Sequence, residues 1–279
     1  MRRVAAVDDA PTALVTGASA GLGLAFARAL AARGHDLVLV ARDAARLEAL
    51  AADLRAQHGA AVQVLPADLA DREALAAVAE RAGSASRPVD LLVNNAGFGL
   101  RQPVVGGDVR EHERALDVMC RAVLVLSAAA ATAMRERGRG AVVNVSSVAG
   151  WTAMGTYAAA KAWTTTFTEG LAGELRGTGV SATALCPGFV RTEFHARMGE
   201  DTSGSPAWAW LDADAVVEQA LADAGRGAVV SVPSRRYALA ALGLRLAPRP
   251  LVRAASGGVG ARRAPWPMGR DRGPRAAGS

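Results

Sequence analysis

Short apolar runs separated by long helical stretches are the feature that most constrains the fold of this chain. Leu37-Val38-Leu39-Val40, Leu91-Leu92-Val93 and Ala141-Val142-Val143 contain no polar alternation. A strand of this kind is buried on both faces, as in a parallel sheet covered by helices. The sequence therefore predicts an α/β fold with a doubly wound, mainly parallel seven-stranded sheet and helices on both faces. Six helical stretches separate strands expected near residues 12–16, 36–41, 61–66, 89–93, 140–146, 179–185 and 228–232.

Composition divides the chain into four parts. The first residues contain no apolar run, so a flexible N-terminus without a signal peptide is expected. The strand and helix pattern forms one domain, in which Asp212 is expected to cap a helix over 212–225. Five prolines and six glycines without a period lie in residues 248–279 and predict disorder there. The predicted parts are 1–11, a domain 12–234 with a substrate loop 188–211, an apolar and basic C-terminal helix 235–252, and a disordered basic tail 253–279.

Charge is unevenly distributed along the chain. The net charge is +6, but residues 235–279 hold ten arginines and one acid, which gives +9 there and −3 in residues 1–234. A basic segment can bind nucleic acid or anionic lipid. Few aromatics and the absence of a nucleic-acid-binding signature make nucleic acid unlikely as a partner. The helix 235–252 either docks on a pocket of its own chain or a partner, or makes a peripheral contact with a membrane surface.

The cysteines indicate the compartment. Cys120 and Cys186 both lie in apolar runs and are expected to be buried free thiols. Since no run reaches about 18 uninterrupted apolar residues, no membrane-spanning helix is expected. The sequence therefore predicts a cytoplasmic protein that is soluble, or at most peripheral at a membrane.

A glycine-rich turn follows the first strand and opens a helix. Thr16-Gly17-Ala18-Ser19-Ala20-Gly21-Leu22-Gly23 lets backbone N–H groups approach a pyrophosphate, and the helix N-terminus adds partial positive charge. This position after a strand is the one expected for a dinucleotide site.

The spacing of this turn resembles the short-chain dehydrogenase/reductases, and further motifs repeat the resemblance over residues 12 to about 235. Asn94-Asn95-Ala96-Gly97, Asp68-Leu69, and Pro187-Gly188 with Thr192 stand after the fourth, third and sixth strands, as in that family. The resemblance implies a Rossmann-type fold. It also implies that Asp68 contacts adenine and that Pro187, Gly188 and Thr192 meet the nicotinamide carboxamide. The residues expected at the cofactor are Gly17, Ser19, Gly21, Leu22, Gly23, Arg42, Asp68, Leu69, Asn94, Ala96, Gly97, Tyr157, Lys161, Pro187, Gly188 and Thr192.

Cofactor choice depends on the residues after the second strand. An acid there would bind a ribose 2′-hydroxyl and repel a 2′-phosphate, whereas this chain has Arg42. Arginine can make a charge-assisted contact with the phosphate, with Ser19 as a second donor. We therefore expect NADP(H) in preference to NAD(H). A solvated Arg42, with Asp43 capping the next helix while serving a ribose, is the alternative.

Tyr157 and Lys161 are the expected acid/base pair. A spacing of four residues places both side chains on one face of a helix. A phenol with a pKa near 10 is a weak acid/base catalyst at neutral pH unless a cation stabilises its phenolate. Lys161 is the sole lysine beside 31 arginines. In the family this lysine also binds the nicotinamide ribose.

Ser147 is the expected substrate-orienting serine, chosen over Ser146, and it shows the first of two departures from the family. Ser147 precedes Tyr157 by ten residues, about three fewer than the family pattern. The second departure is Met119, which stands where the family has an asparagine that holds a water beside the lysine; a thioether cannot replace that amide.

The substrate is expected to be hydrophobic, because Phe98, Trp151, Met154, Phe189, Phe194, Met198, Trp208 and Trp210 gather in the loops after strands four, five and six. Core packing of several of them is the alternative. No metal site is expected, since the four histidines lack ligand spacing; His195 is more often structural than a substrate contact.

The function expected from these residues is hydride transfer between NADPH and a ketone, 3-oxoacyl or steroid-like substrate. Tyr157 would transfer the proton and Ser147 would hold the oxygen. A catalytically impaired dinucleotide-binding regulator or scaffold is the alternative. The resemblance implies a homodimer or homotetramer packed through helices at 110–138 and 156–176.

Overall fold

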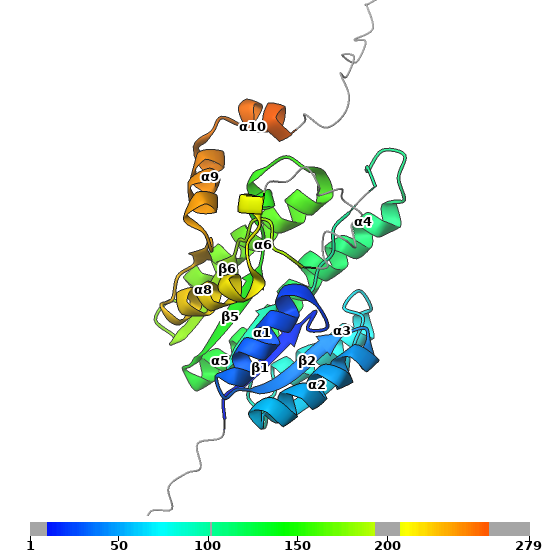
Figure 1. The fold of residues 1–279 in the computed structure, drawn as a ribbon, viewed down its shortest axis with the longest axis vertical. Helices are drawn as coiled ribbons and strands as arrows, with labels where there is room; N and C mark the ends of the chain where they lie inside the picture. The colour runs from blue at the N-terminus through cyan, green and yellow to red at the C-terminus, as the bar shows by residue number, and fades with distance from the viewer. Residues whose placement is uncertain (1–9, 101, 193–206, 257–279) are drawn as a thin grey trace, which may run out of the picture.

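The structure is a computed structural model that describes residues 10–100, 102–192 and 207–256. Its centre is a seven-stranded parallel sheet with the order β3-β2-β1-β4-β5-β6-β7 (Figure 1). This order reverses between β1 and β4, where ligands of open α/β sheets bind. The predicted fold class is confirmed. The strands are β1 (Thr12–Thr16), β2 (Asp36–Ala41), β3 (Val62–Pro66), β4 (Leu91–Asn94), β5 (Gly140–Val145), β6 (Val180–Leu185) and β7 (Val230–Ser231).

Helices cover both faces of the sheet. One apolar cluster joins α1 (Gly21–Ala32), α2 (Ala44–His58) and α8 (Ala213–Gly225) to one face. A second cluster joins α3 (Arg72–Ala82), α5 (Ala122–Arg137) and α6 (Gly155–Glu174) to the other. Because both faces are covered, the strands can be apolar throughout, as the runs in the sequence indicated. Asp212 caps α8, as predicted, by accepting from the Ala215 N–H.

The long helical stretch Val109–Arg137 contains α4 (Val109–Leu116), the π-helical turn η1 (Asp117–Arg121) and α5. Its length and composition would suffice to span a membrane, but half of its most apolar window is buried in the fold. Ala122, Leu126, Ala130 and Met134 belong to the apolar cluster against the sheet. The stretch is therefore a core helix of this domain.

A buried polar network fixes the helices α5 and α6 to the sheet. Asn94 Nδ2 donates to Asn144 Oδ1 at 2.9 Å and to Ser127 Oγ at 3.0 Å, and Asn144 Nδ2 donates to Thr168 Oγ1 at 2.9 Å. Buried amides cost free energy unless they are hydrogen-bonded, so these contacts favour one arrangement of strand and helix. The network holds α6, which carries Tyr157 and Lys161, against β5.

The C-terminal part differs from the single helix predicted for 235–252. Two helices are present, α9 (Arg235–Leu246) and α10 (Arg249–Ser256), and they project beyond the sheet (Figure 1). Pro248 separates them, because proline cannot continue a helix. Ala241 of α9 and Val252 of α10 are buried, so the helices dock on the chain's own domain. Residues 253–256, predicted as disordered tail, belong to α10; residues 1–9, 193–206 and 257–279 lie outside the described residues.

Candidate active site

The glycine-rich turn lies at the carboxyl end of β1, held by the end of β4. Gly17 and Gly21 have φ angles of +66° and +56°, which side chains with a Cβ rarely adopt. A Cβ at Gly23 would lie 2.2 Å from the Gly17 carbonyl oxygen. The turn therefore requires glycine at these positions and leaves main-chain groups uncovered by side chains, a cradle that fits a pyrophosphate.

Asn95 and Thr16 lock this turn in place, and neither was among the residues expected at the cofactor. Asn95 Nδ2 donates to the Thr16 carbonyl oxygen at 2.9 Å, and the N–H groups of Asn95 and Ala96 donate to Thr16 Oγ1 at 2.9 and 3.0 Å. The side chain of Asn94, in contrast, points into the buried network with Ser127 and Asn144. Neighbouring residues of a strand point to opposite faces, and this alternation was the available signal.

Asp68 and Leu69, expected at adenine, have different surroundings. Leu69 is 5% exposed and its side chain packs in the apolar cluster, so only its main chain could face a cofactor. Asp68 pairs with Arg114 and accepts from the Ala70 N–H. Burial alone would raise the pKa of Asp68, but the Ala70 N–H, Arg114 and, at longer range, Arg42 lower it below its usual value. Asp68 is therefore anionic at neutral pH, and Arg42 lies within its electrostatic reach.

The segment after β6 reaches back to the glycine-rich turn. A Cβ at Gly21 would lie 3.4 Å from Cβ of Thr192, although β4 and β5 separate β1 from β6 in the sheet. Pro187 is buried and its carbonyl oxygen accepts from the Val148 N–H at 3.0 Å. The structure thus brings together the turn, Thr192 and the end of β5, which the sequence predicted to share one ligand.

Ser146 and Ser147 at the end of β5 have distinct surroundings. Ser146 is 2% exposed, and its hydroxyl contacts the Lys161 carbonyl oxygen at 2.6 Å and Thr165 Oγ1 at 2.7 Å. Ser147 is half-buried; its hydroxyl accepts from the Ala149 N–H at 3.1 Å and lies 3.4 Å from the Pro187 carbonyl oxygen. Ser147 is therefore the serine with the more accessible hydroxyl.

The short connection from Ser147 to Tyr157 contains a 3-10 turn, η2 (Val148–Trp151). A Cβ at Gly150 would lie 2.9 Å from the backbone nitrogen of Ala162, so this glycine lets η2 lie directly on α6. Gly155, with φ +69°, then starts α6. The connection can be short because a tight turn packed on the helix replaces a longer loop.

Lys161 is the most unusual group of the site. Its side chain is buried, and Nζ donates to the Val145 carbonyl oxygen at 2.8 Å and lies 5.8 Å from the centre of the Tyr157 ring. Burial lowers the pKa of Lys161 to about 8. About nine tenths of the molecules would still carry the ammonium at pH 7, so a cation stands beside the phenol at neutral pH.

Met119 stands where the family has asparagine, within the π-helical turn η1. The side chain is 1% exposed and packs beside Gly97, near the lysine: a Cβ at Gly97 would lie 3.4 Å from Met119 Sδ and 3.6 Å from Lys161 Nζ. The Met119 carbonyl oxygen accepts from Thr164 Oγ1 at 3.2 Å. The π-helical turn η1 is thus tied to α6 through the Met119 main chain, without an amide side chain.

Of the residues predicted to line the substrate pocket, Phe189, Trp208 and Met154 are exposed, whereas Phe98 packs against the small buried cluster of Ala115, Met119 and Ala160. Phe189 and Trp208 are 41% and 65% exposed, so core packing does not account for them. Phe189 packs against Trp210 with ring centres 5.6 Å apart. Phe194, His195 and Met198 lie outside the described residues. Cys186 is buried, as predicted, whereas Cys120 is only half-buried. Both are free, and burial raises the pKa of each to about 11, which keeps them as thiols. No group of metal-ligating side chains occurs among the described residues.

Residues 11–203 match the family model described as short chain dehydrogenase. A short chain dehydrogenase from Pseudocercospora fijiensis is 38% identical over 66% of this chain and 61% of its own length. A galactitol 2-dehydrogenase (L-tagatose-forming) from Cereibacter sphaeroides is 37% identical over 72% of this chain and 79% of its own.

Solved structures agree with the fold. A short-chain dehydrogenase from Sphingobium yanoikuyae in complex with NADPH has a TM-score of 0.78 and 36% identity, covering 91% of this chain and 98% of its own. A bulky-bulky ketone specific alcohol dehydrogenase from Comamonas testosteroni has a TM-score of 0.73 and 30% identity, covering 91% and 96%.

The first prediction concerns the pKa of Lys161, which can be measured alone because no other lysine exists in the chain. Protein labelled with [¹⁵N]lysine should show a single side-chain resonance that titrates with a midpoint near pH 8. The physical reason is burial of the ammonium. A midpoint near the ordinary lysine value of about 10.4 would contradict this account of the site.

Proposed function

The chain belongs to the short chain dehydrogenase family, and we propose that it transfers hydride between NADPH and the carbonyl or alcohol carbon of a bulky hydrophobic substrate. As a member of this family it is an oxidoreductase. The observation that carries the proposal is the buried Lys161 ammonium beside the Tyr157 ring, at the carboxyl end of β5.

Ser147, Tyr157 and Lys161 are the catalytic residues of the proposal. The Tyr157 phenol gives a proton to the substrate oxygen during reduction, and the ammonium beside it stabilises the phenolate that remains. The Ser147 hydroxyl, with two main-chain neighbours at 3.1 and 3.4 Å, holds the same oxygen. A bound NADPH would supply the hydride.

The cofactor residues of the proposal surround the cradle. The main chain of Gly17, Ser19, Gly21, Leu22 and Gly23 would hold the pyrophosphate, with Ala96 and Gly97 beside it. Lys161 and Tyr157 would hold the nicotinamide ribose, and Pro187, Gly188 and Thr192 the carboxamide. Asp68 and the main chain of Leu69 and Asn94 would line the adenosine end.

A hydrophobic substrate is supported by exposed apolar side chains in the loops after strands β5 and β6. Phe189, Trp208 and Met154 expose 41%, 65% and 59% of their surface. Exposed apolar side chains around a site lose contact with water when an apolar ligand binds, which favours ketone, 3-oxoacyl or steroid-like substrates over sugars. The Comamonas testosteroni neighbour is specific for bulky ketones by its description.

The activity prediction uses NADPH oxidation with aromatic ketones, 3-oxoacyl thioesters, steroids and sugars. The wild type should turn over at least one hydrophobic class faster than sugars. Tyr157→Phe should lower kcat by about 100-fold or more, because the proton donor is lost, while NADPH affinity measured by fluorescence falls far less, because the main-chain cradle and Lys161 remain.

Two outcomes would contradict this proposal. Preference for sugars would refute the substrate class. Tight NADPH binding by the wild type without turnover on any of these substrates would favour the alternative, a dinucleotide-binding regulator or scaffold with an impaired site.

NADPH preference depends on Arg42 and Ser19 in the proposal. Arg42 lies at the end of β2, is exposed, and lowers the pKa of Asp68 through its charge. A guanidinium at this place fits the 2′-phosphate of NADPH. Asp43 caps α2 by accepting from the Arg46 N–H, so it has a structural task of its own.

Arg42→Ala tests the cofactor preference. The ratio kcat/KM for NADPH should fall about 10- to 100-fold, as expected for the loss of a charge-assisted hydrogen bond, while the value for NADH should stay nearly unchanged. Arg176→Ala, another exposed arginine, is the control. Equal losses with both cofactors would show that Arg42 does not read the phosphate.

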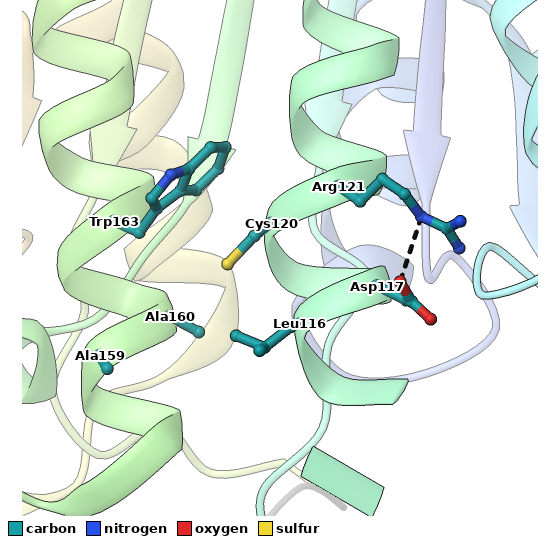
Figure 2. A pocket seen from close by; sticks show the side chains of 7 residues that line it. All are labelled: Leu116, Asp117, Cys120, Arg121, Ala159, Ala160 and Trp163. Carbon is teal, nitrogen blue, oxygen red and sulfur yellow. Dashed lines mark ion pairs between the residues drawn. The ribbon is translucent and has the colours of Figure 1, made fainter. Parts of the chain in front are cut away.

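We propose a homodimer packed through α5 and α6. An apolar hollow of about 380 Å³ lies between η1 and α6, where Leu116 and Cys120 point toward Trp163 while Asp117 and Arg121 pair on the other side (Figure 2). Trp163 stacks on Phe167 along α6, with centres 4.9 Å apart. Leu124 of α5 is 45% exposed. A second copy would cover these apolar groups.

The outer face of α9, by contrast, is the surface through which a membrane contact would be made.

The dimer can be tested by a matched pair of variants. Sedimentation at micromolar concentration should give about twice the 28.5 kDa of one chain, and Leu124→Glu should give monomers. Leu239→Glu, 71% exposed on α9, should leave the dimer intact. A monomeric wild type would exclude this interface, and dissociation only by Leu239→Glu would move the interface to α9.

A further inference from the structure

Tyr237 of α9 lies directly on Gly188, in the segment after β6. A Cβ built on Gly188 would lie 2.1 to 2.3 Å from Cζ, Cε1 and Cε2 of the Tyr237 ring, and these are its three nearest atoms. Gly188 is not among the glycines with positive φ, so its backbone accepts other residues. The Tyr237 ring is therefore the contact that requires a glycine at this position.

The Tyr237 hydroxyl spans the two ends of the loop 188–211. It donates to the Ala209 carbonyl oxygen at 2.7 Å and accepts from the Phe189 N–H at 3.2 Å. The same ends meet in a parallel bridge between Val190 and Leu211. The Leu211 N–H donates to the Phe189 carbonyl oxygen at 2.8 Å. Residues 188–191 and 209–211, called the neck below, are thus joined by main-chain hydrogen bonds and by the Tyr237 phenol.

Neighbouring contacts hold the C-terminal helices to the same region. The Arg236 guanidinium lies 6.0 Å from the Trp208 ring and donates to the Trp208 carbonyl oxygen at 3.0 Å. The Arg245 guanidinium lies 5.8 Å from the Trp151 ring of η2. Ser256 of α10 accepts from the Ala153 N–H at 3.1 Å. The two helices therefore connect the neck of the loop with the connection that follows Ser147.

We propose that Tyr237 is a positioning residue that holds residues 188–191 against residues 209–211, and that α9 thereby helps to shape the active site. The ring fixes the position of Gly188, and the hydroxyl fixes the distance between the main chains of Phe189 and Ala209. Tyr237 touches no reacting atom in this account. The inference rests on the proposed function only where it concerns substrate and cofactor.

Apart from Tyr237, few apolar side chains of α9 pack against the rest of the chain. Ala241 is the only fully buried residue of the helix, and Leu239, Leu242 and Leu246 are 71%, 52% and 76% exposed. Apolar burial stabilises in proportion to the area removed from water, so this helix contributes few apolar contacts of its own. Beside the Arg236 contacts with Trp208, the Tyr237 ring with two hydrogen bonds at its tip is the contact by which α9 can act on this segment.

A double-mutant cycle at Gly188 and Tyr237 tests the contact. Gly188→Ala should lower kcat/KM by about tenfold or more, because the methyl group displaces the ring. In a Tyr237→Ala background the same methyl group has room, so the loss caused by adding Gly188→Ala should be at least about threefold smaller than the loss in the wild-type background. Gly170→Ala in α6, whose added Cβ would meet nothing within 4 Å, is the control. An equal loss from Gly188→Ala in both backgrounds would overturn the proposal.

Tyr237→Phe separates positioning from chemistry. It keeps the ring over Gly188 and removes both hydrogen bonds, so KM for substrate should rise about 3- to 10-fold. The value of kcat and its pH profile should remain, since Tyr157 is untouched. A fall in kcat without a change in KM would contradict the positioning role.

A readout that needs no turnover keeps this test independent of the proposed function. Arg191 is exposed at the neck, and opening the neck should expose its main chain to trypsin. Cleavage after Arg191 should be faster in Tyr237→Phe than in the wild type at equal thermal stability. Unchanged cleavage would overturn the positioning role of Tyr237 even if the protein proved to have another function.

Discussion

The hydrogen bonds that attach α6 to β5 are the interaction on which the rest of the site depends. A buried ammonium needs a polar partner, and Lys161 finds it in the Val145 carbonyl oxygen at the end of β5. Ser146 holds the Lys161 carbonyl oxygen, and Asn144 holds Thr168 two turns along the helix. Three consecutive residues at the end of β5 thus fix the helix that carries Tyr157 and Lys161: Asn144 and Ser146 through their side chains and Val145 through its carbonyl oxygen. The dinucleotide cradle on β1 and the loop after β6 are arranged around this fixed pair.

The sequence predicted the sheet and the proposed reactive residues because each depends on a local pattern. Apolar runs define buried strands, glycine turns follow strand ends, and a spacing of four places Tyr157 and Lys161 on one helix face. The roles of Asn94 and Asn95 could not be assigned in this way. Both are polar residues at one strand end, and only the pleat decides that Asn94 enters the core network while Asn95 holds the turn.

Long-range contacts were beyond the reach of the sequence. Tyr237 stands 48 residues from Phe189, and no motif links the two positions. The helix 235–252 looked like one basic and apolar element, whereas Pro248 divides it and its inner face packs on the site. Leu69 matched a family motif, yet its side chain belongs to the core. A motif fixes where the main chain runs, but contacts with distant elements decide what the side chain does.

The two departures from the family can be understood together. The connection after Ser147 is short because η2 packs on α6 through Gly150, and Met119 is accommodated because a π-helical turn brings its carbonyl oxygen to Thr164. Both changes place main chain against α6, which carries Tyr157 and Lys161. At position 119 this chain thus contacts α6 through the Met119 carbonyl oxygen, where the family has an asparagine side chain.

The central claim is that an ammonium, and no other cation, is needed at position 161. Lys161→Arg tests it most directly, because every basic residue of this chain other than Lys161 and the histidines is an arginine. The planar, longer guanidinium does not fit the site of Nζ beside Val145. We predict that kcat for carbonyl reduction falls about 100-fold or more in this variant, measured below the temperature at which the variant begins to unfold. A variant that retains kcat within about threefold would contradict the account.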